Sequence, residues 1–92
     1  MITVPGISAG DADVARSLLA TTADAAVSTG ARAAASGATR TGGLEAWTFQ
    51  RVEDVESLLA LLEDHRRHGT LGPDKVHAVD RLIARLTAAC RA

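Results

Sequence analysis

The spacing of the apolar residues changes near residue 50, and this change constrains the fold most. Residues 44–49 alternate apolar and polar side chains and contain both aromatic residues of the chain. Period-two alternation is typical of a half-buried strand, and aromatic side chains fit a pleated surface. Aliphatic residues then recur at helical spacing at Val52, Val55, Leu58, Leu59 and Leu62. The sequence therefore predicts a strand that leads directly into an amphipathic helix.

The residues before this strand are compatible with a β-hairpin. An alanine-rich helix that begins near Ser8 or Asp11 would end at Gly30, because glycine readily takes the left-handed conformation that ends many helices. Residues 31–36 would then form the first strand. A glycine-rich reversal at residues 37–43 would join it to the second.

A second interpretation keeps residues 11–36 as one long helix. Residues 31–36 are alanine except for Arg32 and Ser36, and alanine is the best helix former and is depleted in strands. Local propensity favours the long helix, whereas the pattern of residues 47–63 favours the hairpin. We predict an α+β, mainly helical fold with an N-terminal helix, a short hairpin and two C-terminal helices. The alternative is an all-α three-helix bundle.

The first of the two C-terminal helices is predicted over residues 51–68. Its first turns are acidic and its last turn is basic, so both ends suit the helix dipole, and Gly69 ends it. Its aliphatic residues make it the centre of the expected core. Leu59→Ala is the substitution expected to unfold the chain, at a cost of about 2–5 kcal/mol.

The last helix is predicted over residues 73–90, because Pro73 suits a first helical position. Apolar residues three and four apart form a seam along it: Val76, Val79, Ile83, Leu86 and Cys90. Two heptads are too short for a free coiled coil, so this seam must pack on the preceding helix or on another subunit. The short connection at residues 69–72 favours an antiparallel helix pair.

Composition favours an assembly protein over a free-standing enzyme. The chain has 92 residues, which is one small domain, and its 47% hydrophobic content is raised by alanine, with one Trp, one Phe and no Tyr. Such a chain builds a thin core, and a partner surface is a natural place to bury more. Pro5 and Gly6 indicate that residues 1–10 form an extended arm ahead of a single helical domain at residues 11–92.

Charge and cysteine content exclude several classes of protein. The net charge is −1 with no basic tail, unlike an autonomous duplex binder. The single cysteine, Cys90, cannot form an internal disulfide and fits a reducing compartment. No stretch approaches the ~20 apolar residues that span a bilayer, and residues 1–7 do not form a secretory signal. We therefore expect no membrane association.

Candidate chemistry is sparse. His65 and His68 lie three apart, and His77 and Cys90 could join them as zinc ligands, but no second close-spaced ligand pair accompanies them. Capping of the helix end explains the two histidines better. No Gly-Lys-Ser/Thr follows the glycines of residues 37–43, so they are not a phosphate loop. We predict no catalytic residue, no metal, no cofactor and no enzymatic activity.

The order of elements resembles small phage head-completion proteins of the lambda gpW type. The matching features are Thr29-Gly30, the segments on either side of Gly42-Gly43, Thr48 as the entry to a helix, and that helix's apolar spacing. The helical matches are Val55, Leu59, Leu62 and Glu63. The resemblance covers residues 11–63, and this chain departs from it by adding a strong helix after Glu63.

This resemblance implies a virion structural protein that is assembled in the bacterial cytoplasm. Copies would form a homo-oligomeric ring on the phage portal, contact neighbouring connector or tail proteins, join head to tail and help to retain packaged DNA. Partner or oligomer contacts are then expected at Leu44, Trp47, Phe49, Val76, Val79, Ile83 and Leu86. Arginines that could face a DNA channel, with non-specific contact, are Arg32, Arg40, Arg66 and Arg67.

Two alternatives from other classes remain. The chain could be a small bacterial interaction module, a regulator or antitoxin-like binder that acts through the seam of residues 73–90. It could also be a small helical nucleic-acid-binding protein, since the helices around residues 69–72 superficially resemble a helix-turn-helix. The candidate reading helix then offers Lys75, His77, Arg81 and Arg85.

Overall fold

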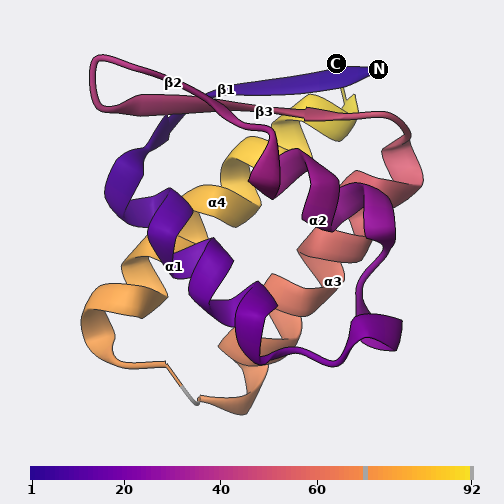
Figure 1. Ribbon diagram of the computed structural model, residues 1–92. Helices are drawn as coiled ribbons and strands as arrows, with labels where there is room; N and C mark the ends of the chain where they lie inside the picture. The colour runs from indigo at the N-terminus through magenta and orange to yellow at the C-terminus, as the bar shows by residue number, and fades with distance from the viewer. Residues whose placement is uncertain (70, 92) are drawn as a thin grey trace.

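The computed structural model describes residues 1–69 and 71–91 and shows helices on one side of a small sheet (Figure 1). The elements are β1 (Ile2–Ser8), α1 (Ala9–Thr21), the 3-10 turn η1 (Asp24–Ala26), α2 (Thr29–Ser36), β2 (Thr39–Thr41), β3 (Leu44–Phe49), α3 (Val52–His68) and α4 (Pro73–Arg91). The predicted α+β, mainly helical class is confirmed, and the all-helical alternative is wrong.

The sheet is antiparallel in the order β1-β3-β2, so β3 is its central strand. β2 and β3 form a hairpin closed by Gly42 and Gly43, whose φ angles are +60° and +81°. Two-residue hairpin loops of type I′ require positive φ at both central residues, which glycine adopts without strain. A hairpin is therefore present, but its first strand is Thr39–Thr41 and the predicted strand over residues 31–36 is wrong.

Residues 31–36 are helical because a capped helix begins just before them. The Ser28 hydroxyl accepts a hydrogen bond from the Ala31 amide at 3.2 Å, and alanine then continues α2. The long-helix interpretation is also wrong, because α1 ends at Thr21. The hydroxyls of Thr21 and Thr22 both bond to the Leu18 carbonyl, and Thr22 leaves the helix with extended backbone angles.

Gly30 does not end a helix; it is the second residue of α2. A Cβ built at this position would lie 2.1 Å from the Asp54 carboxylate, which comes from the first turn of α3. Asp54 is buried and accepts a hydrogen bond from the Ser28 hydroxyl at 2.9 Å. Gly30 therefore allows the N-terminal turns of α2 and α3 to approach one another closely.

Gly30→Ala is expected to lower the free energy of unfolding by about 1–2 kcal/mol, because overpacking costs more than the ~1 kcal/mol gained in helix propensity. Gly10→Ala is the matched control: Gly10 is also the second residue of a serine-capped helix, and nothing lies within 4 Å of a Cβ built there. It should stabilise the chain slightly. Urea unfolding measures both, and equal stabilisation would contradict the close contact.

The predicted separate arm at residues 1–10 is also wrong. Residues 2–8 are extended, but they form β1 and pair with β3, with Thr3 opposite Thr48. Val4 and Ile7 are each 1% exposed. A bulge between them, with Gly6 at a φ of +73°, lets both side chains reach the core. This segment belongs to the same domain as the rest.

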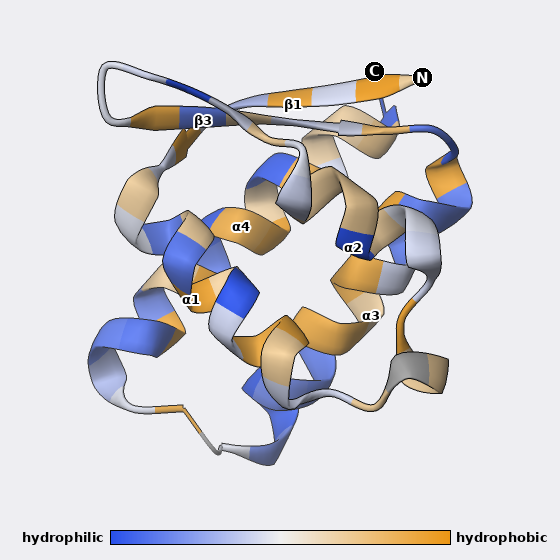
Figure 2. Cartoon of the chain, viewed as in Figure 1, coloured by the Kyte–Doolittle hydropathy of each residue, from blue (hydrophilic) through white to orange (hydrophobic). Residues whose placement is uncertain are grey.

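The two C-terminal helices are close to the predictions. α3 ends at His68 with Gly69 in the left-handed conformation, and α4 begins at Pro73. The core lies between the sheet and the helices, as the apolar inner sides in Figure 2 show. Its largest fully buried side chains include Trp47, Phe49, Ile7, Leu58, Leu62, Leu82 and Leu86. Leu59 is only partly buried, so Leu58 rather than Leu59 lies at the centre of the core.

Candidate protein-binding surface

The sheet turns one set of side chains toward the helices and the other toward solvent. Along β3, Glu45, Trp47 and Phe49 are buried, whereas Leu44 and Thr48 are exposed. Residues opposite one another in antiparallel strands share a face of the sheet. The pairs on the solvent side include Thr3 with Thr48, Thr39 with Ala46, and Thr41 with Leu44. We call these six residues the outer sheet face.

The outer sheet face carries no charged side chain, in a chain of which 23% is charged. The hydroxyl oxygens of Thr3 and Thr48 are 3.3 Å apart, so even these polar groups pair with one another. Among residues 1–69 and 71–91, the exposed large hydrophobic side chains are Met1 (84%), Leu44 (49%) and Val52 (38%). Leu44 lies on this face. Met1 comes just before β1 and Val52 shortly after β3, at the opposite end of the sheet, where Ile2 pairs with Phe49. Figure 2 shows the sheet in pale and orange tones apart from blue segments in β2 and β3.

A buried ion-pair network lies on the inner side of the sheet, behind the outer sheet face. Glu45 is 2% exposed, and its carboxylate accepts hydrogen bonds from Arg16, Arg40 and Trp47. Arg16 binds both carboxylate oxygens, Arg40 donates from Nη2 at 2.6 Å, and the indole Nε1 donates at 3.1 Å. The hydrogen bonds from Arg16, with those from Arg40 and Trp47, lower the pKa of Glu45 to about 2, against the opposing effect of burial.

Arg16 connects this network to α2. Its Nε and Nη2 donate to the Ala35 carbonyl at 3.3 and 3.0 Å, and its guanidinium lies 5.4 Å from the centre of the Trp47 ring. That geometry suits a cation–π contact. α1, the end of α2 and the hairpin are therefore held together by one side chain.

This arrangement contradicts the predicted partner contacts at Trp47 and Phe49. Both side chains are 0% exposed, so no partner can touch them in this fold. Leu44 is the one predicted hairpin contact that is accessible. The reason is which side chains of β3 face the core. Glu45 points inward because two arginines and the indole satisfy its carboxylate, and the alternation along the strand then places Leu44 outside.

The predicted seam on the last helix is also largely buried within the chain. Val79 and Leu86 are 0% exposed and Leu82 is 1% exposed, and α4 contacts α1, α3 and β1. Val76 and Ile83 are partly exposed at the margin of this packing. The seam therefore closes the chain's own core, and Val79 and Leu86 are not available to a partner. Partial burial also raises the pKa of the Cys90 thiol.

The four arginines predicted to face DNA are not brought together. Arg32 donates to the Leu19 and Thr22 carbonyls, each at 2.9 Å, and so caps the end of α1. Arg40 binds Glu45, and Arg66 donates to Asp80 at 2.9 Å. Arg67 is exposed at the end of α3, which lies far from the hairpin in Figure 1. Three of the four arginines thus have structural partners.

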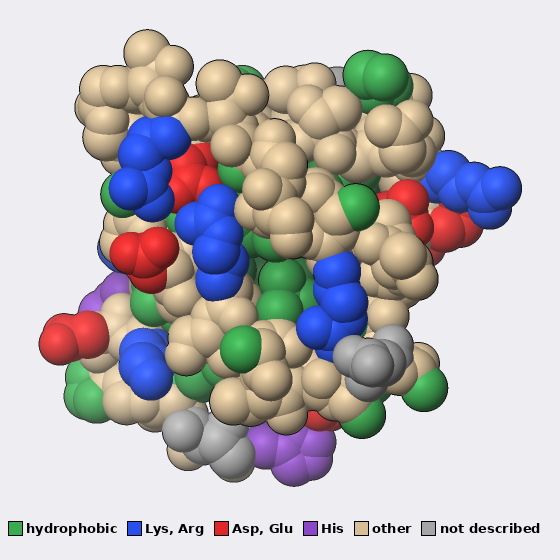
Figure 3. All heavy atoms as spheres, in the orientation of Figure 1, with side chains coloured by type: hydrophobic (Ala, Val, Ile, Leu, Met, Phe, Trp, Pro, Cys, Tyr) green, Lys and Arg blue, Asp and Glu red, His purple; other side chains and the backbone are tan. Residues whose placement is uncertain are grey.

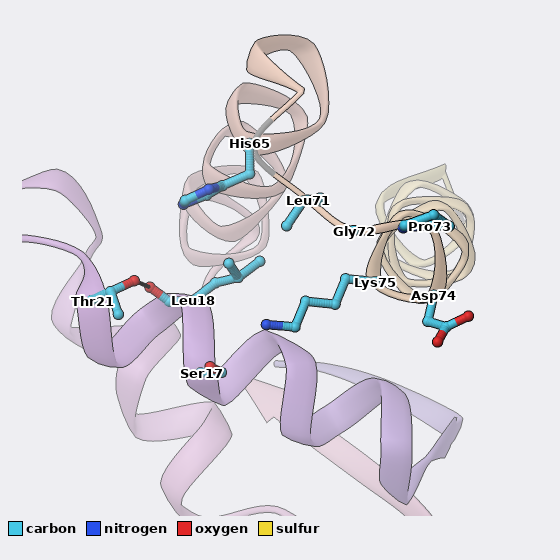
Figure 4. Close-up of a pocket in the computed structure, with 9 residues that line it drawn as sticks. All are labelled: Ser17, Leu18, Thr21, His65, Leu71, Gly72, Pro73, Asp74 and Lys75. Atoms are coloured by element: carbon cyan, nitrogen blue, oxygen red, sulfur yellow. Dashed lines mark hydrogen bonds between the residues drawn. The ribbon is translucent and has the colours of Figure 1, made fainter.

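A hollow of about 540 Å³ lies between α1 and the start of α4 (Figure 4). Lys75 reaches toward the turn of α1 that holds Ser17, while Asp74 points away. The hydrogen bond drawn among the lining residues joins Thr21 to the Leu18 carbonyl, within α1. Among the described residues, no group of three or more His, Cys, Asp or Glu side chains is placed to hold a metal ion.

In residues 1–69 and 71–91, none of the helices combines the length and the apolar character needed to cross a membrane. No protein-family model, curated protein or solved structure matches this chain.

Proposed function

We propose that this protein is a non-enzymatic assembly protein that binds a protein partner through its outer sheet face. The observation that carries the proposal is a charge-free sheet face with exposed Leu44 at one end. The centres of protein–protein interfaces are depleted in charged residues relative to the rest of the surface. The Glu45 network ties β3 to α1 and β2 through hydrogen bonds, and a surface that is preorganised loses less entropy on binding.

The partner we propose is a component of the head–tail junction of a tailed phage, with the portal first. The order α2, β2–β3 hairpin, α3 is the helix–hairpin–helix order of lambda gpW-like proteins, although Thr29-Gly30 begins α2 instead of ending a helix and the first strand is Thr39–Thr41. In this proposal copies of the chain stand as a ring around the portal and join head to tail in the virion. They retain packaged DNA by closing the channel. Direct contact between DNA and the predicted arginines has less support, because Arg32, Arg40 and Arg66 are already bonded within the chain.

The two alternative functions have less support. An interaction module that acts through residues 73–90 would need a seam whose main residues lie in the core. A nucleic-acid-binding helix would need Arg81 and Arg85. Arg81 makes two hydrogen bonds to Asp11, at 2.9 and 2.8 Å, and Arg85 donates to the Pro5 carbonyl. These bonds hold α4 against α1 and β1.

Placing charges on the outer sheet face tests the proposal. Leu44→Lys with Thr48→Lys is expected to leave the melting temperature nearly unchanged, because both positions are exposed. It should weaken binding to the portal protein encoded nearest to this chain at least about tenfold, since each lysine would have to be desolvated in the interface. Mass photometry of the mixed proteins measures the complex.

Ala60→Lys with Ala84→Lys is the matched control, because it adds the same charge at exposed positions of α3 and α4. This variant should bind as the wild type does. Equal loss in both variants would show a non-specific charge effect and overturn the assignment of the surface. A wild-type chain that does not bind the portal would end the phage proposal.

A further inference from the structure

The two edges of the sheet differ in how well they are guarded. The β1 edge has a bulge between Val4 and Ile7 and a proline, which lacks an amide donor, at position 5. Arg85 covers this edge: its Nη1 lies 3.4 Å from the Pro5 carbonyl oxygen, and a Cβ built on Gly6 would meet the same nitrogen at 2.9 Å. Bulges, proline and covering groups are the devices by which proteins prevent strands from adding to an edge. β1 is closed to another strand.

The β2 edge lacks these devices. All three residues of β2 are exposed, its ladder with β3 is regular, and it contains no proline. A charged side chain often guards an edge, but the Arg40 guanidinium is held on the inner side of the sheet by Glu45. The short length of β2 is the remaining protection. The outer side of β2 is therefore open to another strand.

The charges beside this edge suit a second copy of the same chain. Asp13 lies next to Arg40, with 3.9 Å between carboxylate and guanidinium, and their side chains are 69% and 55% exposed. Arg16 and Glu45 join this group, so each edge carries two cations and two anions in contact with one another. Figure 3 shows acidic and basic side chains gathered in this part of the surface. A twofold contact requires a surface that complements itself. Two such edges meet without net charge. Each Arg40 is neutralised by Glu45 of its own copy, so the two arginines can approach one another across the contact.

We propose that β2 pairs antiparallel with β2 of a second copy about a twofold axis centred on Arg40. The product is a six-stranded sheet in the order β1-β3-β2-β2-β3-β1, in which the two outer sheet faces join into one surface. Thr39 of each copy then lies opposite Thr41 of the other. Because β2 is only three residues long, the association is weak, and it becomes measurable above about 0.1 mM.

Sedimentation velocity between about 10 µM and 1 mM tests the proposal on the full chain without any partner. The wild type is expected to shift from monomer toward dimer. Asp13→Arg should weaken the dimer at least about tenfold, whereas Asp74→Arg, which adds the same charge at an exposed residue of α4, should not. Circular dichroism confirms that both variants are folded.

Disulfide cross-linking tests the strand pairing itself. In a Cys90→Ser background, a Thr39→Cys chain mixed with a Thr41→Cys chain should form a mixed disulfide under mild oxidation. It should form several-fold faster than when Thr39→Cys is mixed with Thr48→Cys, which is an exposed threonine away from the edge. A chain that stays monomeric at 1 mM, or cross-linking no faster than in the control pair, would overturn the proposal. Neither result bears on portal binding, which each monomer can make through its own outer sheet face.

Discussion

Replacing Leu58 by alanine is expected to lower the free energy of unfolding by about 2–5 kcal/mol. Leu58 is 0% exposed in the core between the sheet and the helices, so the substitution leaves a cavity that its neighbours fill only in part. A domain of this size has a total stability of about 5–15 kcal/mol. The loss is therefore a large fraction of the whole, and urea unfolding followed by circular dichroism measures it.

Leu59→Ala is the control, on the adjacent residue of the same helix. Leu59 is partly buried, so the side chain loses fewer contacts and the expected cost is clearly smaller. Losses of equal size, or a larger loss at Leu59, would show that α3 is rotated relative to the sheet.

Glu45→Gln is expected to cost about 2–4 kcal/mol at pH 7. Removing one partner of a buried ion pair costs about 3–5 kcal/mol, and the loss is reduced here because Arg16 and Arg40 are 34% and 55% exposed and remain partly solvated. The substitution keeps the shape of the side chain, so the change reports on charge. Exposed Glu53→Gln is the matched control and should change stability little.

The same carboxylate gives the wild type a defined dependence on pH. The pKa of Glu45 falls from 4.5 to about 2 on folding, so its contribution is complete above pH 4.5 and is lost as the pH falls toward 2. The lost stability amounts to about 3 kcal/mol. Glu45→Gln should flatten this part of the pH profile, although Asp11, whose pKa is lowered by its hydrogen bonds with Arg81, leaves a residual slope. Identical acid profiles for wild type and variant would contradict the network.

Local signals in the sequence were enough to predict the C-terminal helices. Gly69 and Pro73 mark the boundaries between α3 and α4, and the acidic and basic ends of α3 agree with its dipole. β1 could not be predicted in the same way. Pro5 and Gly6 argue against a strand, and the segment becomes one because β3 offers it a pairing edge and the core accepts Val4 and Ile7.

The candidate surface was predicted only in part, because the direction of each side chain depends on partners that are distant in sequence. Leu44 and Trp47 were both predicted as partner contacts, but Leu44 is exposed and Trp47 is buried. A carboxylate at position 45 normally faces water, which would have turned Trp47 outward as well. Arg16, 29 positions earlier, reverses that preference. The sequence contains Arg16, Arg40 and Glu45, but no local pattern indicates that they meet.

The central place of β3 has a consequence for how the chain folds as it is made. Thr3 and Thr48 lie opposite one another but are 45 positions apart in the chain. On the ribosome β1 therefore emerges well before β3, the strand that it must join. β3 also lies between β1 and β2, so β1 has no other strand to pair with. Contacts of such long separation slow folding. A nascent chain that stops short of residue 44 has no sheet at all, and the hydrophobic side of its opening segment stays uncovered until translation passes that point.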